Sequence, residues 1–271
     1  MVPTFDCVNP IFERSEADGF LGLVNSSSPE QLRRFDVEAV RIGGVAVLSM
    51  PGPDASFWCQ AVGFTESPSA DLIGEIVDHY RDRSVAGARF VLPPYAETAA
   101  WDDIARKYGL VAAGRGLKLA ARLPLDVPAG ASGLRVARVE PADAERWSTA
   151  MWDIFGMAGE ANIALMSATL HRPEFEAYAC WDGDEIVATG LVRLHPDAAH
   201  LFSGATRPAY RGRGAQSALI AVRVEAAQRV GCPLVIAETG VVDDGYNTSA
   251  RNLIRVGFTP QYDRTIWMWT A

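Results

Sequence analysis

The residues with the clearest chemical potential form a glycine- and arginine-rich loop, Arg211-Gly212-Arg213-Gly214-Ala215-Gln216-Ser217. The pattern predicts a strand over 199–206 before this loop and a long helix from about 212 to 229 after it. The first N–H groups of a helix have no partner within the helix, and the helix dipole adds partial positive charge there. Two glycines leave this backbone uncovered, and the arginines add cationic donors. The loop therefore predicts a cradle for a pyrophosphate group.

The elements around this loop follow from periodicity and turn residues. A hairpin is predicted for 174–181 and 185–194, around the turn Asp182-Gly183-Asp184. The helix after the loop has an apolar face with the spacing of Leu219, Val222, Ala226 and Val230. The remaining predicted elements of this half are helices over 141–157, 160–170 and 248–256, and strands over 234–238 and 262–269. The predicted order is ααβββαβαβ.

The N-terminal half repeats the later part of this order. Its predicted elements are strands over 57–64, 89–92 and 115–122 and helices over 70–81 and 98–107. Gly109-Leu110 and Gly257-Phe258 then occupy matching places at helix ends, which favours a duplicated fold. Prolines, glycines and small residues predict a linker between the halves. We therefore expect one domain at 1–124, a linker at 125–133 and a second domain at 134–271.

These features resemble the GNAT N-acetyltransferase superfamily. Its loop motif, Q/R-x-x-G-x-G/A between a strand and a helix, is matched by Arg211 and Gly214, whereas Gln216 replaces the last Gly/Ala. A second family motif, an Asn/Ser-bearing helix ending in Gly-Phe, is similar to residues 247–258. The resemblance implies an α/β fold of two tandem GNAT-like domains. Each would have a mixed, mostly antiparallel central sheet flanked by helices.

The resemblance also implies the ligand and the reaction. The loop would bind the pyrophosphate of acetyl-CoA, and backbone groups of Ala205 and Thr206 would hold the pantetheine arm and the thioester carbonyl. The implied acceptor is an amine of a small molecule. The residues expected at the cofactor are Ala205, Thr206, Arg211, Gly212, Arg213, Gly214, Ala215, Gln216, Ser217, Asn247, Ser249 and Asn252.

The proton-transfer groups are less clearly marked. The tyrosine that often serves as the acid in this family is replaced by Leu253, so Tyr246 is the candidate acid, with a simple loop aromatic as the alternative. Glu238 ends a buried strand and is the candidate base, acting through water, or it only positions the substrate. We interpret His195 and His200 as solvated residues beside a turn. No cysteine or histidine has metal-ligand spacing, so no metal is expected.

Residues 65–71, Thr-Glu-Ser-Pro-Ser-Ala-Asp, lack glycine and carry two carboxylates where the N-terminal half would need a cradle. We therefore expect a degenerate first domain that binds no CoA and packs against the second.

Composition excludes several broad classes of function. The net charge of −8 argues against nucleic-acid binding, and no apolar run or leader suggests a membrane. A cytoplasmic protein, monomeric or homodimeric, is expected. Two alternatives remain open: an acyl-CoA-binding sensor without turnover, and a protein N-acetyltransferase.

Overall fold

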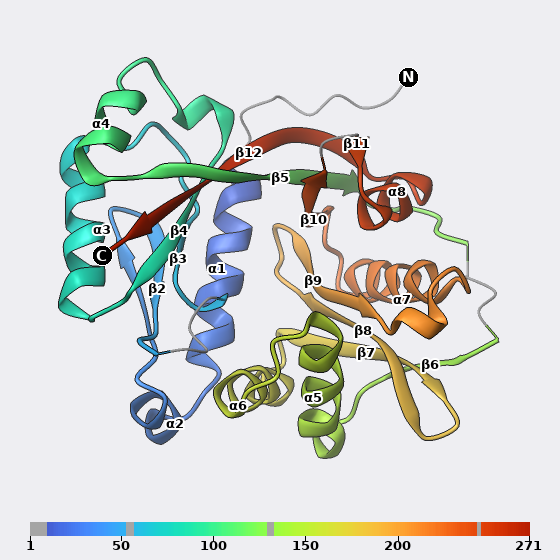
Figure 1. The fold of residues 1–271 in the computed structure, drawn as a ribbon. Helices are drawn as coiled ribbons and strands as arrows, with labels where there is room; N and C mark the ends of the chain where they lie inside the picture. Colours follow the sequence, from blue (N-terminus) through green and yellow to red (C-terminus); the bar gives the residue numbers. More distant parts are fainter. Residues whose placement is uncertain (1–9, 53–56, 129–132, 243–244) are drawn as a thin grey trace. The chain divides into compact units, whose positions relative to one another are not determined.

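The computed structural model describes residues 10–52, 57–128, 133–242 and 245–271, and Figure 1 labels their elements. These residues form two compact units. Unit 1 takes the described residues up to 118 together with 240–242 and 261–271, and unit 2 takes 119–239 and 245–260. Residues 129–132 of the predicted linker lie outside the described residues. No helix in the described ranges is long and apolar enough to cross a membrane.

Unit 1 contains a mixed sheet with helices. The strand order is β1 (Glu38–Ile42), β2 (Val45–Ser49), β3 (Gln60–Val62), β4 (Gly87–Leu92), β12 (Thr259–Thr270) and β5 (Val111–Arg122). The pair β3–β4 is parallel, whereas β1–β2, β2–β3 and β4–β12 are antiparallel. The helices are α1 (Ile11–Asn25), α2 (Pro29–Arg34), α3 (Ala70–Asp82) and α4 (Trp101–Tyr108). Helix α3 buries Ile73, Ile76, Val77 and Tyr80, whose three- and four-residue spacing gives one apolar face.

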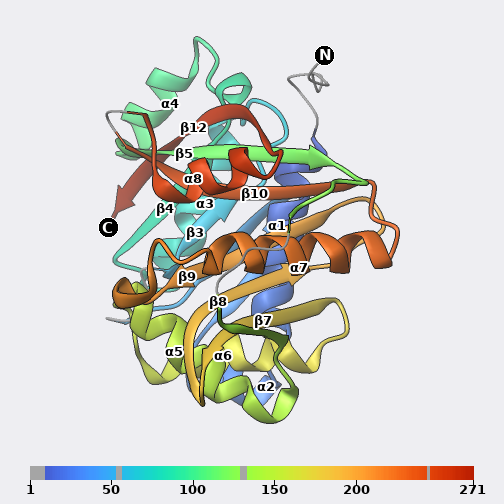
Figure 2. The ribbon, with the colours of Figure 1, turned by 90° about the vertical axis from the view of Figure 1, so that its right-hand side faces the viewer.

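Unit 2 holds a second run of strands. Its strand order is β10 (Leu234–Val242), β9 (Ala199–Thr206), β8 (Glu185–Arg193), β7 (Phe175–Asp182) and β6 (Arg135–Arg138). Only β9–β10 is parallel among these pairs. The other elements are α5 (Ala144–Phe155), α6 (Glu160–Ala168), α7 (Ala215–Arg229), the short β11 (Gly245–Tyr246) and α8 (Thr248–Arg255). Helix α7 packs along β7, β8 and β9 (Figure 2).

The predicted elements and their internal repeat are present. The order β3–α3–β4–α4–β5 recurs as β9–α7–β10–α8–β12, and in each run the first and third members form the parallel pair. Gly109 ends α4 and Gly257 follows α8, both with positive φ, +71° and +106°. A residue with a Cβ is strained in that region, which is why glycine stands at both stops. The mixed α/β fold class is confirmed.

The chain's last strand is placed differently from the sequence expectation. Residues 261–270 of β12 lie in unit 1, where the strand pairs antiparallel with β4 from Thr265↔Leu92 to Thr270↔Gly87. The end of β5, residues 119–122, belongs in turn to unit 2, and within that unit the Leu123 N–H donates to Pro233 O at 2.9 Å. The compact units thus differ from the expected domains. Unit 1 includes residues 261–270 of β12, and unit 2 includes residues 119–122 of β5. Local periodicity shows that a strand forms but not which sheet it joins.

Candidate functional site

The N-terminus of α7 is open, as the glycine-rich loop predicts. Its N-cap residue is Gly214, with φ +81° and no side chain to cap the helix. The Ala218 N–H makes the first turn's bond, to Gly214 O at 3.0 Å, so the N–H groups of residues 215–217 have no partner within the helix. A Cβ at Gly212 would meet no atom within 4 Å, so the space beside the loop is open.

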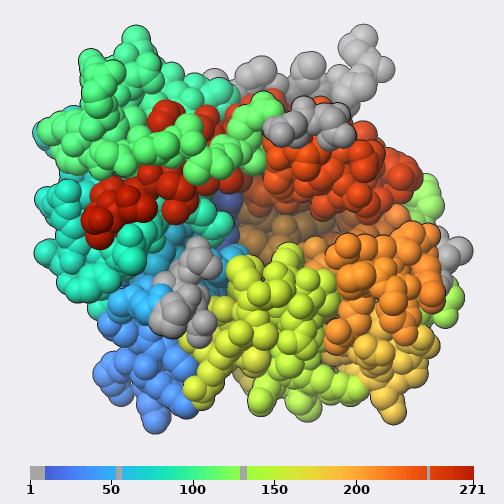
Figure 3. Space-filling model, viewed as in Figure 1, coloured from blue at the N-terminus to red at the C-terminus, as the bar shows by residue number. Residues whose placement is uncertain are grey.

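These donors face a cavity of about 550 Å³ in unit 2. Figure 3 shows the surface of unit 2 hollowed between yellow-green α5, the orange loop before α7 and red-orange α8. The lining residues are Ile154, Phe155, Gly204, Ala205, Thr206, Tyr210, Arg211, Gly212, Gly214, Ala215, Gln216, Ser217, Thr248, Ser249, Asn252 and Arg255. The end of β9, the loop, and helices α5 and α8 thus lie around the open N-terminus of α7, a kind of helix terminus that suits an anion.

Most of the residues predicted at the cofactor line this cavity, and two do not. The Arg213 guanidinium lies over the Tyr210 ring, 5.0 Å from its centroid. Asn247 is the N-cap of α8, and its side-chain oxygen accepts the Ala250 N–H at 2.8 Å. Asn247 thus has a structural role at the helix that carries Ser249 and Asn252.

Gln216, the residue that departs from the loop motif, turns its side chain back to β9. Its Nε2 donates to Ala205 O at 2.8 Å and to Thr206 Oγ1 at 2.9 Å. The amide thus ties the first turn of α7 to the end of the strand. Gln216 is larger than the Gly or Ala of the motif, but its side chain points toward β9 and so leaves the N-terminus of α7 uncovered.

Within the described residues, the edge of β9 that faces away from β8 has no strand partner at Thr206, where the Arg211 Nε donates to Thr206 O at 3.2 Å. Its register with β10 covers only Ala199–Leu201, whereas its register with β8 runs on to Thr206. The Arg207 N–H donates to Val187 O of β8 at 2.9 Å. Because N–H groups alternate between the two edges of a strand, the Thr206 N–H points away from β8. Thr206, more than Ala205, is therefore placed to donate to a ligand in the cavity.

Glu238 lies one residue beyond Ala237, the last residue of β10 that pairs with β9, and does not line the cavity. Its Oε2 is 2.5 Å from the Nε2 of His200, which is fully buried and stacked on Phe202 with ring centroids 4.1 Å apart. The interpretation of His200 as a solvated loop residue is therefore wrong. Alternation along 199–206 places His200 and Phe202 on one face, a signal that outweighs their nearness to a turn.

The candidate acid, Tyr246, and the residue at the place of the family's tyrosine, Leu253, both lie outside the cavity lining. Tyr246 lies in β11 and is 43% exposed, and it does not line the cavity. Leu253 is buried and brings no proton donor. Within the described ranges, no group of three or more His, Cys, Asp or Glu side chains is placed to hold a metal ion.

The residues of the cavity wall that the predicted set lacks are Ile154, Phe155, Gly204, Tyr210, Thr248 and Arg255. Phe155 is 44% exposed, unusual for a large apolar side chain at a helix end. The sequence signal nearest to this part of the wall is Gly156, the C-cap of α5, which has a left-handed backbone conformation.

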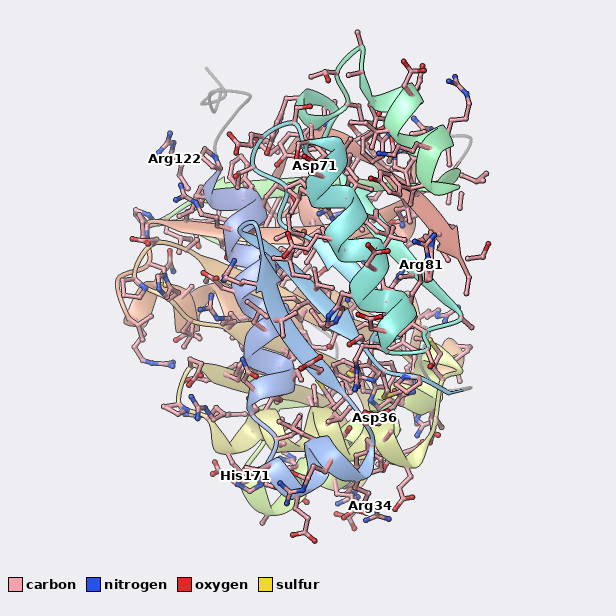
Figure 4. All side chains as sticks on the ribbon, turned by 90° about the vertical axis from the view of Figure 1, so that its left-hand side faces the viewer. Arg34, Asp36, Asp71, Arg81, Arg122 and His171 are labelled. Atoms are coloured by element: carbon pink, nitrogen blue, oxygen red, sulfur yellow. The ribbon has the colours of Figure 1, made fainter. Side chains whose placement is uncertain are left out.

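Unit 1 has no equivalent open terminus at α3. Its N-cap Ser69 accepts the Leu72 N–H at 3.1 Å, which satisfies one of the first donors of the helix. Asp71 adds a carboxylate in the first turn, and Arg81 lies in the last (Figure 4). These charges neutralise the helix dipole and repel an anion at the N-terminus. Helices α3 and α7 occupy the same place in the fold, since each follows the first strand of a parallel pair. The difference between their N-termini therefore comes from the residues at the N-cap and in the first turn, and not from the topology.

Comparisons with known proteins agree with this geometry. Residues 141–258 match the profile of the acetyltransferase (GNAT) family. A GCN5-related N-acetyltransferase from Kribbella flavida shares the fold with a TM-score of 0.63 at 19% identity, over 96% of both chains. Another GCN5-related N-acetyltransferase, from Sphaerobacter thermophilus, gives 0.64 at 17% identity, over 97% of this chain and 91% of that one.

A tandem GNAT protein from the clavulanic acid biosynthesis pathway gives a TM-score of 0.58 at 14% identity, over 98% of this chain and 97% of that one. No curated protein sequence matches the chain. At these identities the solved structures show the shared fold, and it extends over both halves of the chain.

Proposed function

We propose that the protein transfers an acetyl group from acetyl-CoA to the amine of a small molecule, because residues 141–258 match the profile of the acetyltransferase (GNAT) family. The observation that carries the proposal is the uncapped N-terminus of α7 at Gly214, which opens into a cavity beside the edge of β9 that faces away from β8.

The residues of the cavity suit this ligand. The N–H groups of residues 215–217 would hold the pyrophosphate, and the exposed Arg211 and Arg255 add charge-assisted donors beside them. The Thr206 N–H on this edge of β9 would receive the thioester carbonyl and stabilise its negative charge. When bound, acetyl-CoA supplies the activated acyl group.

The acceptor's proton would leave through Glu238. Its carboxylate is held by the buried His200, and it lies where β9 and β10 cease to pair. We propose that Glu238 accepts the proton of the attacking amine through water, and that Tyr246 is the candidate donor to the departing thiolate. The amine and the acyl group would gain the remaining rate enhancement from being held together.

Replacing Glu238 by glutamine keeps the side-chain shape but removes the proton acceptor. We expect kcat to fall about 100-fold, while the Kd for acetyl-CoA changes by less than about threefold. Steady-state kinetics and calorimetry on the same preparation measure both quantities. Glu225→Gln, at an exposed carboxylate of α7, is the matched control and should leave kcat unchanged. A Glu238→Gln variant with full activity would remove Glu238 from the mechanism.

The proposed activity is tested by thiol release. Purified protein is mixed with acetyl-CoA and a panel of primary amines, and free CoA is followed against a no-amine blank. Amine-dependent release supports the enzyme. Leu253, at the place of the family's tyrosine, favours a second candidate, a sensor that binds acyl-CoA without turnover. The sensor would bind acetyl-CoA and release no thiol with any acceptor.

A further inference from the structure

Arg223 is a cation buried in unit 2 and bonded to backbone carbonyls. The residue is 3% exposed and lies on α7, and its Nε donates to Leu219 O at 2.9 Å. Its Nη1 donates to Phe202 O at 3.1 Å and to Leu191 O at 3.3 Å. Burial lowers the pKa of Arg223 to about 10, so the guanidinium is charged at neutral pH. A buried charge is costly to keep, which calls for a reason.

Two of these carbonyls, those of Leu191 and Phe202, flank an irregularity of the sheet. Thr189 of β8 pairs with Ala205 of β9, and Leu191 pairs with Phe202. Two residues of β9, Ser203 and Gly204, therefore oppose the single Gly190, which is the pattern of a β-bulge. Ser203 has φ +53°, a conformation that is costly for a residue with a Cβ. Something must hold the strand in this shape.

The neighbouring glycines leave room for the side chains of α7. A Cβ on Gly190 would lie 2.8 Å from Cζ of Arg223, and one on Gly204 would lie 3.2 Å from Oε1 of Gln216. Gln216 and Arg223 are seven residues apart, about two helical turns, so they point from the same face of α7. Gln216 binds Ala205 O after the bulge and Arg223 binds Phe202 O before it.

We propose that Arg223 is a positioning residue, which clamps the bulge of β9 so that the backbone of residues 204–206 faces the cavity in its donating conformation. Arg223 itself does not line the cavity and acts through the strand. The structural part of this inference, that the guanidinium holds the bulge, is independent of any ligand. The catalytic part rests on the proposed function, because it assumes that the thioester carbonyl is received at this edge.

Hydrogen exchange tests the structural part without any ligand. In Arg223→Met, which keeps an unbranched chain of similar length, we expect amides of residues 202–206 to exchange about tenfold faster than in the unaltered protein. Peptides from 234–238 should be unchanged. Glu225→Gln, at an exposed position of the same helix, is the control and should leave exchange at 202–206 unchanged. Unchanged exchange at 202–206 in Arg223→Met would overturn the proposal, whether or not the protein proves to be an acetyltransferase.

Kinetics then test the catalytic part. We expect Arg223→Met to lower kcat about 100-fold while the KM for acetyl-CoA stays within about threefold, because the α7 terminus that binds the pyrophosphate is intact. Arg223→Lys, which keeps a cation on the helix, should recover part of kcat. Gly190→Ala displaces the guanidinium without changing charge and should act in the same direction, so the test survives if Arg223→Met fails to fold. A KM that rises as much as kcat falls would overturn the positioning role.

Discussion

Gly214→Glu is expected to abolish acetyl-CoA binding, with a loss of affinity of about 1,000-fold or more. Two effects add. Gly214 has φ +81°, so any residue with a Cβ strains the N-cap of α7. The new carboxylate also places negative charge where the helix dipole and three free N–H groups would receive the pyrophosphate. Isothermal titration calorimetry of the variant and of the unaltered protein measures the difference directly.

The same helix offers the control for this variant. Gly231 lies just beyond the C-terminal end of α7 with φ +78°, and a Cβ there meets no atom within 4 Å. Gly231→Glu therefore brings the same backbone strain and the same charge away from the cavity, and should bind acetyl-CoA as before. If both variants lost binding equally, the loss would reflect destabilisation of α7, and the assigned cradle would be unsupported.

Lys118→Met is expected to destabilise unit 1 by about 3–5 kcal/mol, the largest effect on stability that we predict. Lys118 is fully buried, and its Nζ lies 2.9 Å from Glu16 Oε2 and 3.6 Å from Glu13 Oε1. Arg264 of β12 also pairs with both carboxylates. Removing the lysine leaves two buried carboxylates with one cation between them. Urea unfolding followed by tryptophan fluorescence measures the loss.

Two further variants make this prediction specific. Lys107, the chain's only other lysine, is exposed on α4, and Lys107→Met should leave the urea midpoint unchanged. Adding Glu16→Gln to Lys118→Met restores the balance of charge and should recover part of the stability. A Lys118→Met protein as stable as Lys107→Met would show that the four charged groups do not stabilise unit 1 as a neutral cluster.

Local patterns were sufficient for most of the elements and for the open N-terminus of α7. The strand 199–206 was predicted to the residue, and the glycines of the loop marked the open helix terminus. Both depend on short-range rules, namely alternation, turn chemistry and the unpaired donors at a helix start. Those rules need no knowledge of the tertiary fold.

Contacts between distant segments were not predictable in this way. The expected apolar face of α7 included Val222 and Val230, yet Val230 is 51% exposed and Arg223 is buried instead. An arginine in a helix is normally expected to face solvent, and only the bulged strand opposite explains its burial. The burial of Glu13 and Glu16 in α1 was equally unpredictable, because the cations that pair with them lie more than 100 residues away in the sequence. The placement of β12 in unit 1 depends on such contacts too.

The central claim is that the protein has one acetyl-CoA site, at the N-terminus of α7, and that the capped, acidic N-terminus of α3 has none. Calorimetric titration of acetyl-CoA into the full-length protein tests it most directly. We predict a stoichiometry of one per chain, lost in Gly214→Glu and kept in Gly231→Glu. Two sites per chain, or no binding by a folded protein, would contradict the account.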